Sequence, residues 1–171
     1  MPFGPDKRGL SAPVASQLGV NTRSVVVRHS VHIERPVEAV RAVFEAGPRN
    51  WLLLTAFGSK VGDVESQKIV AVEVGEPLAI GDWIEVPVKW QATFIKKLLP
   101  VMAGTIEVSP VDPRSTRLTV CGMYESPEGR LGEQLDQTLM HRVAQATVME
   151  LAVSIAKQLE ALTAEPTRGP V

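Results

Sequence analysis

The sequence has a single cysteine, Cys121, so no disulfide can form within the chain. A chain without disulfides suits a reducing compartment, and we predict a cytoplasmic protein. The first residues carry early prolines and charges, and they lack the apolar stretch of a signal peptide. We therefore expect no secretory leader.

The chain also lacks a surplus of charge of either sign. Lys and Arg number 18 and Asp and Glu number 19, which gives a formal net charge of −1. Proteins that coat nucleic acid draw their affinity from a large basic surplus, so we expect no nucleic-acid partner. The longest apolar stretches, such as Trp51–Leu54 and Leu98–Ala103, are far shorter than the roughly 20 residues that span a bilayer. We expect no stable membrane insertion.

What is present fits one domain. The chain has 171 residues, of which 44% are hydrophobic, and a domain of this size hides roughly 70% of its unfolded surface without metal or disulfide cross-links. Both ends are rich in glycine and proline without hydrophobic periodicity. We predict a flexible N-terminal arm over residues 1–22, a folded domain over 23–163 and a tail over 164–171.

The hydrophobic pattern predicts strands and helices in a definite order. Alternating apolar residues predict strands, and Pro36 and Gly47 mark the two ends of the first helix. The predicted strands are Ser24–Ile33, Lys68–Val74, Trp83–Trp90, Ala103–Val111 and Thr116–Glu125, and the two later helices are Asn50–Ala56 and Arg130–Leu162. Strands joined by short turns favour an antiparallel meander. We therefore predict an α+β helix-grip fold, in which a curved antiparallel sheet wraps around the long C-terminal helix and two short helices follow the first strand.

The same alternation assigns residues to the two faces of the sheet. In the second strand it places Val70, Val72 and Val74 on one face and Ile69 on the other. Pro87 indicates an edge strand or a bulge. In the long helix the apolar stripe drifts: Leu131, Leu135, Leu139 and Val143 mark one side, and Val148, Leu151, Ile155 and Leu159 mark another. We expect a bend, or a gradual wrap around the sheet, near Val143–Thr147.

Three stretches of the chain are similar to a known superfamily: Val25–Trp51, Val86–Trp90 and Leu98–Val148. The last contains Thr116-Arg117-Leu118, Tyr124 followed by Pro127 and Gly129, and His141-Arg142-Val143-Ala144. These motifs resemble the SRPBCC superfamily, the START-related helix-grip proteins that include small bacterial members of the polyketide cyclase/dehydrase-like type. The resemblance covers about Ser24–Leu162. It implies a helix-grip fold that encloses hydrophobic ligands between sheet and helix, and a minority of such proteins are cyclases, aromatases or hydrolases.

The candidate ligand site follows from the inner face of the predicted sheet and the facing side of the long helix. His29 lies on the apolar face of the first strand, either as a hydrogen-bonded core histidine or as a ligand-contacting or acid/base group. Tyr124 and Trp90 either pack in the core or fix a polar group of the ligand. The candidate ligand-binding residues are Val27, His29, Val31, Trp90, Ile106, Val120, Tyr124, Leu139, Arg142, Val143 and Thr147. We assign no firm catalytic residue.

No motif in the sequence points to a metal or a cofactor. His29 and His32 take opposite faces of their strand, and the sequence holds neither HExxH nor CxxC spacing. It also holds no glycine-rich phosphate-binding motif. Cys121 takes the outer face of its strand, where a packing role is expected. We expect no metal and no cofactor.

An unfilled cavity has a large energetic cost. At about 24 cal/mol per Å³, roughly 300 Å³ of empty apolar space would cost about 7 kcal/mol, so such a space must hold a ligand or water or must collapse. We therefore favour a monomeric or homodimeric binding protein or carrier for a small hydrophobic molecule such as a lipid, fatty acyl or polyketide-like compound. The alternatives are a polyketide cyclase or dehydratase that uses His29 as acid or base, and a non-catalytic module that contacts other proteins through its N-terminal arm.

Overall fold

A computed structural model of the chain describes residues 22–48, 52, 68–94, 97–98, 100–127 and 137–164. In chain order the elements are β1 (Thr22–Ile33), α1 (Val37–Glu45), β2 (Lys68–Val74), β3 (Leu78–Ile80), β4 (Trp83–Phe94), β5 (Lys97–Leu98), β6 (Met102–Asp112), β7 (Ser115–Pro127) and α3 (Gln137–Leu162). Apart from Thr22 and Ala164, the predicted arm and tail lie outside the described residues. So does the predicted helix Asn50–Ala56, except for Leu52, which is helical and buried.

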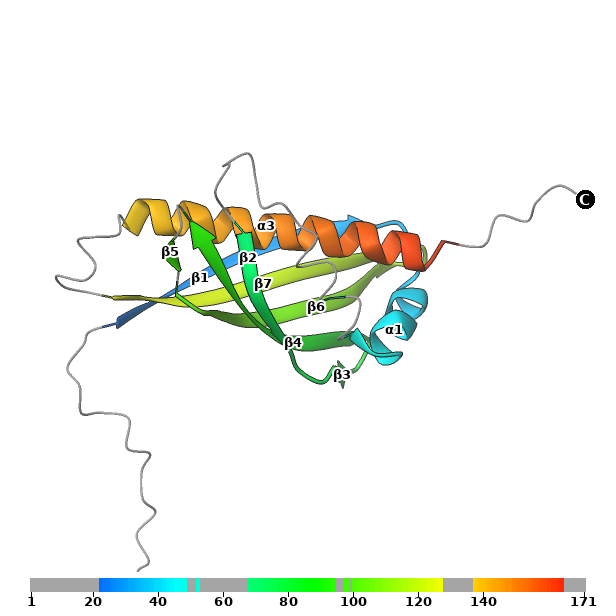
Figure 1. Ribbon diagram of the computed structural model, residues 1–171. Coiled ribbons are helices and arrows are strands. Elements are labelled where there is room, and N and C mark those ends of the chain that lie inside the picture. The colour runs from blue at the N-terminus through cyan, green and yellow to red at the C-terminus, as the bar shows by residue number, and fades with distance from the viewer. Residues whose placement is uncertain are drawn as a thin grey trace, which may run out of the picture.

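The strands form one antiparallel sheet, and α3 lies along its concave face (Figure 1). The strand order is β1-β7-β6-β4-β2, and the short strands β3 and β5 also pair with β4. Helix α3 packs mainly against β1 and β7, while α1 covers one end of the interface. The predicted α+β helix-grip fold is confirmed.

Two glycines face each other across the neighbouring strands β6 and β7. Gly104 of β6 is the register partner of Gly122 of β7. A Cβ atom on Gly104 would overlap the backbone carbonyl of Cys121, so only glycine fits there. A Cβ atom on Gly122 would lie 2.7 Å from Cη2 of Trp90, because the indole ring covers this glycine. The missing side chains leave room for the close β6–β7 contact and for a large ring that lies across the sheet.

Strand β2 contains a bulge that changes which of its residues face inward. Ile69 pairs with Ala92 whereas Ala71 pairs with Gln91, so the register shifts between them. Ile69 is buried at 6% exposure, and Val72 and Val74 pack against the same core. The prediction that Ile69 lies on the opposite face from Val72 and Val74 was wrong, because strict alternation ignores the extra residue.

Pro87 lies inside the sheet rather than on an edge strand. Strand β4 pairs with β6 on one side and with β2 and β3 on the other, so the predicted edge position was wrong. The amide of Gly75 donates to the carbonyl of Pro87 at 2.8 Å. The nitrogen and carbonyl of a strand residue face the same neighbour. The proline nitrogen therefore faces the Gly75–Pro77 segment between β2 and β3, and the ladder with β6 stays intact.

The buried side of α3 is one continuous stripe. It runs along Met140, Ala144, Val148, Leu151, Ile155 and Leu159, together with their neighbours on the same side. Leu139 is 37% exposed and does not belong to it. Residues four apart do not stay on one line along a helix, because four residues turn it by more than one full turn. The predicted stripe Leu131, Leu135, Leu139 and Val143 therefore placed Leu139 on the buried side, which was wrong. Figure 1 shows α3 as a single rod without the expected bend. Residues 130–136 of the predicted helix lie outside the described residues.

Candidate functional site

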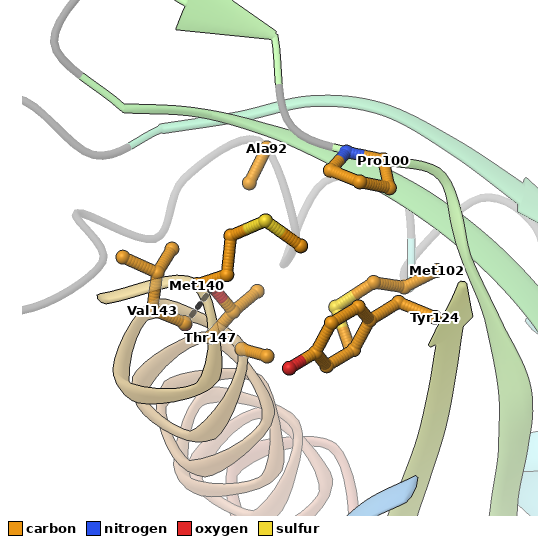
Figure 2. Close-up of a pocket in the computed structure, with 8 residues that line it drawn as sticks. Ala92, Pro100, Met102, Tyr124, Met140, Val143 and Thr147 are labelled. Atoms are coloured by element: carbon orange, nitrogen blue, oxygen red, sulfur yellow. Dashed lines mark hydrogen bonds between the residues drawn. The ribbon is translucent and has the colours of Figure 1, made fainter. Parts of the chain in front are cut away.

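A small cavity lies between the N-terminal half of α3 and the inner face of β4, β6 and β7 (Figure 2). Its volume is about 20 Å³, which is room for about one water molecule. The residues that line it are Ala92, Pro100, Met102, Tyr124, Met140, Val143, Ala144 and Thr147. This cavity is far smaller than the hollow that the sequence predicted.

The sheet register and the helix period bring these residues together. Met102 pairs with Trp90, and the pairing of Ala103 with Met123 sets Met102 beside Tyr124 on the inner face. On α3 the lining residues Met140, Val143, Ala144 and Thr147 follow helical spacing, so they form one face of the helix. The cavity therefore lies between two regular elements rather than in a loop.

One part of the wall is more accessible than the rest. Pro100, which precedes β6, is half-buried, whereas the other lining residues are buried. Figure 2 shows Pro100 on the opposite side of the cavity from α3. Pro100 is therefore the most exposed of the described residues that line the cavity.

The polar groups in the wall are two hydroxyls. Thr147 Oγ1 donates to the carbonyl of Val143 at 2.8 Å, so its proton is already used within the helix. The hydroxyl of Tyr124 points toward α3 in Figure 2. Burial raises the pKa of the Tyr124 phenol above its usual value of 10.0, so the group stays protonated and neutral at physiological pH. None of the described residues in the wall carries a charge.

A second polar group lies close behind the wall. Trp90 is 1% exposed, and its indole nitrogen Nε1 has no hydrogen-bond partner in the described part of the chain. Trp90 does not line the cavity itself, but its register partner Met102 does. A buried N–H group without an acceptor is rare in native proteins.

Apart from His29, the predicted site residues fall into three groups. Tyr124, Val143 and Thr147 line the cavity. The residues Val27, Trp90, Ile106 and Val120 are buried in the core on the same inner face, and Val31 packs against them half-buried. Leu139 and Arg142 lie on the exposed side of α3.

His29 lies on the inner face of β1, as its position in the alternation predicted. It is half-buried, and its register partner is Val120 of β7. It is not among the residues that line the cavity. His32 is exposed on the opposite face of the same strand.

Five lining residues were absent from the sequence prediction: Ala92, Pro100, Met102, Met140 and Ala144. The alternating pattern could have found two of them. Ala92 lies two residues after Trp90, and Met102 lies four residues before Ile106, so both belong to the inner face. Met140 and Ala144 lie three residues before the predicted Val143 and Thr147. Selecting the helix residues that share one face with Val143 and Thr147 would have included Met140 and Ala144.

The described residues hold no group of three or more His, Cys, Asp or Glu side chains that could bind a metal ion. In the same residues no helix is both long and apolar enough to cross a membrane. Cys121 is half-buried on the outer face, beside its register partners Arg28 and Thr105. Arg28 there forms a salt bridge of 2.8 Å with Glu107.

Comparison with solved structures agrees with the architecture. The protein TTHA0849 of Thermus thermophilus aligns at 13% identity with a TM-score of 0.51, over 82% of this chain and 100% of that one. The Zhui aromatase/cyclase of Streptomyces sp. R1128 aligns at 13% identity and a TM-score of 0.40, over 82% and 94%. A START superfamily protein of Mycobacterium smegmatis aligns at 14% identity and a TM-score of 0.41, over 80% and 98%.

These identities describe the fold alone. The chain has a helix-grip fold, the architecture that the sequence resemblance implied. The sequence matches no protein-family model and no curated protein. The function must therefore be argued from the site.

Proposed function

We propose that this protein binds a small hydrophobic ligand between the N-terminal half of α3 and the inner face of the sheet. The observation that carries the proposal is the neutral, apolar cavity around Tyr124 and Thr147, whose described wall has no charged side chain. A general ligand-binding role fits the helix-grip fold. Ligand pockets are mostly apolar, with a few polar groups that fix orientation.

The small volume describes the protein without a ligand. At about 24 cal/mol per Å³, a cavity of about 20 Å³ costs only about 0.5 kcal/mol, against about 7 kcal/mol for roughly 300 Å³. Met102 and Met140 are unbranched and adopt many rotamers, so their movement enlarges the space at little cost. A ligand that buries about 300 Å² of apolar surface gains roughly 7 kcal/mol before association costs.

The cavity favours binding over catalysis. Tyr124 is the one titratable group among the described residues that line it, and its raised pKa keeps it protonated, so it cannot accept a proton at physiological pH. His29, the candidate acid or base of a cyclase or dehydratase, belongs to another part of the inner face. We also propose that the protein acts in the cytoplasm, since its one cysteine leaves it without an internal disulfide.

Displacement of a fluorescent fatty-acyl probe, combined with native mass spectrometry of gently purified protein, tests the proposal. Ala144→Phe fills the cavity from α3 and is expected to weaken probe binding at least about tenfold, because the added ring occupies the ligand volume. Gln145→Phe adds the same ring at the next residue, which is exposed, and should leave binding unchanged.

Two results would contradict the proposal. One is a protein that shows only its own mass and neither binds nor releases the probe. The other is equal weakening by Ala144→Phe and Gln145→Phe, which would place the probe on the surface of the helix.

A further inference from the structure

The indole of Trp90 reaches across the sheet to Gly122 of β7. Its Cη2 and Cζ2 atoms lie 2.7 and 2.9 Å from the point where a Gly122 Cβ would stand. Gly122 is on β7 and Trp90 is on β4, so the ring crosses the intervening strand β6 over the paired glycines. The ring edge that carries Nε1 also carries Cζ2, so this donor lies near Gly122.

Met102 separates that donor from the cavity. Its terminal methyl Cε lies 2.9 Å from the same point above Gly122, and its side chain lines the cavity. The methyl group and the indole edge therefore meet at one place in the wall. Because a methionine side chain changes rotamer easily, its displacement brings the indole N–H to the cavity surface.

The described part of the wall then offers two hydrogen-bond donors and no cation. The indole N–H can only donate, and the protonated Tyr124 hydroxyl can also donate. The Thr147 proton is already bonded to the carbonyl of Val143. Burying a carboxylate without a cation is costly, whereas a neutral carbonyl oxygen is matched by these donors.

We propose that the ligand is a neutral molecule with an apolar body and a carbonyl-type acceptor, which the Trp90 indole N–H and the Tyr124 hydroxyl bind after Met102 moves aside. This inference rests on the proposed function and names the chemical class of its ligand. It explains why a donor with no partner among the described residues is kept in a core that is otherwise apolar. A ketone or an ester fits this description, and a free carboxylate does not.

Three probes of similar shape separate the alternatives: acetophenone, ethylbenzene and benzoate. Heteronuclear NMR of the full chain gives both the dissociation constants and the indole N–H resonances. The Trp90 resonance is identified by its loss in Trp90→Phe. We expect acetophenone to move that resonance downfield and ethylbenzene to leave it near its free position, because only the ketone accepts a hydrogen bond.

Tyr124→Phe removes one donor and keeps the ring. The ratio of ethylbenzene affinity to acetophenone affinity should rise about fivefold in this variant, as expected for one neutral hydrogen bond. The comparison with ethylbenzene cancels any change in cavity size. If Trp90→Phe fails to fold, the Tyr124→Phe ratio and the wild-type indole shift still decide the question, with the resonance assigned from its contacts to Met102.

Each outcome has one meaning. Benzoate binding tightest, or an unchanged affinity ratio with an unmoved Trp90 resonance, would overturn the carbonyl assignment and leave the hydrophobic binding site standing. Binding of none of the three probes, together with failure to bind the fluorescent fatty-acyl probe, would overturn the proposed function itself.

Discussion

The two ends of the interface between α3 and the sheet are packed differently. At the end covered by α1, side chains such as Ile33, Phe44 and Leu159 are 0% exposed. At the other end Met102 and Tyr124 keep 5–6% exposure around a small cavity. The same helix thus closes the core completely at one end and incompletely at the other.

The difference lies in the kinds of side chain that meet. The closed end is filled by branched and aromatic residues that have few rotamers and interlock. The cavity end combines small alanines with flexible methionines. This division shows how one domain can obtain stability from one half of a helix and keep adjustable space along the other half.

The strongest test of this comparison truncates one residue at each end of α3. Leu159→Ala should lower the free energy of unfolding by about 4 kcal/mol, because the rigid surroundings cannot fill the void. Met140→Ala should lower it by about 2 kcal/mol, since flexible neighbours at the cavity relax into the space. Urea denaturation of both variants measures the two values. Equal losses would show that the ends are equally rigid.

The glycine pair offers a second test, with a smaller expected effect. Gly104→Ala should destabilise the protein by about 3 kcal/mol, because its methyl group meets the carbonyl of Cys121 within the β6–β7 ladder. Gly122→Ala meets the end of the flexible Met102 side chain at 2.9 Å and the Trp90 ring at 2.7 Å, and should cost about 1 kcal/mol.

The two variants should rank in the opposite order for ligand binding: Gly122→Ala, which destabilises the protein less, should weaken binding more. Gly122→Ala pushes Met102 toward the cavity and is expected to weaken probe binding, whereas Gly104→Ala leaves the cavity wall in place at temperatures where it is folded. Thermal unfolding and probe titration measure the two properties. Weaker binding by Gly104→Ala alone would contradict the assignment of Met102 to the wall.

The smallest effect concerns alkaline pH. Tyr124 is the only tyrosine in the sequence, so tyrosinate absorbance reports this residue alone. Because burial raises its pKa above 10.0, its midpoint should lie higher in the folded protein than in urea. The phenol therefore ionises more easily in the unfolded chain than in the folded one. Its contribution to stability is lost as the pH rises past 10.0, and the loss is complete above the folded pKa.

Tyr124→Phe provides the control for this titration. The variant should lack the part of the alkaline loss of stability that comes from the phenol, while other groups still titrate. A midpoint in the folded protein at or below its value in urea would show that solvent reaches the hydroxyl freely.

The sequence was sufficient to predict the order of the main elements along the chain, most of the buried rows and the long helix. Alternation in Thr116–Glu125 put Leu118, Val120 and Tyr124 on the inner face, and all three are buried. Alternation failed at Ile69, where a bulge inserts a residue, and the edge position indicated by Pro87 was wrong because the neighbouring strand is interrupted there. Both errors come from partner strands, which no local pattern within one strand reveals.

The candidate site was less predictable than the fold. The sequence identified Tyr124, Val143 and Thr147, which line the cavity, and it also selected Leu139 and Arg142, which lie on the exposed side of α3. Hydrophobicity alone cannot tell a residue that touches empty space from one that touches another side chain. That distinction depends on the volumes that meet across the interface, and it required the structure.

The segment Gly75–Pro77 separates β2 from β3, so one side of β4 is hydrogen-bonded to two different strands. Residues Trp83–Glu85 pair with β3, and Val88–Thr93 pair with β2. Separation of β2 therefore leaves the bonds to β3 intact, and the two stretches of backbone amides should exchange with deuterium as distinct cooperative units. Ala92, which lines the cavity, belongs to the second unit. The cavity wall can therefore open locally while the β3–β4 hairpin beside α1 keeps its hydrogen bonds.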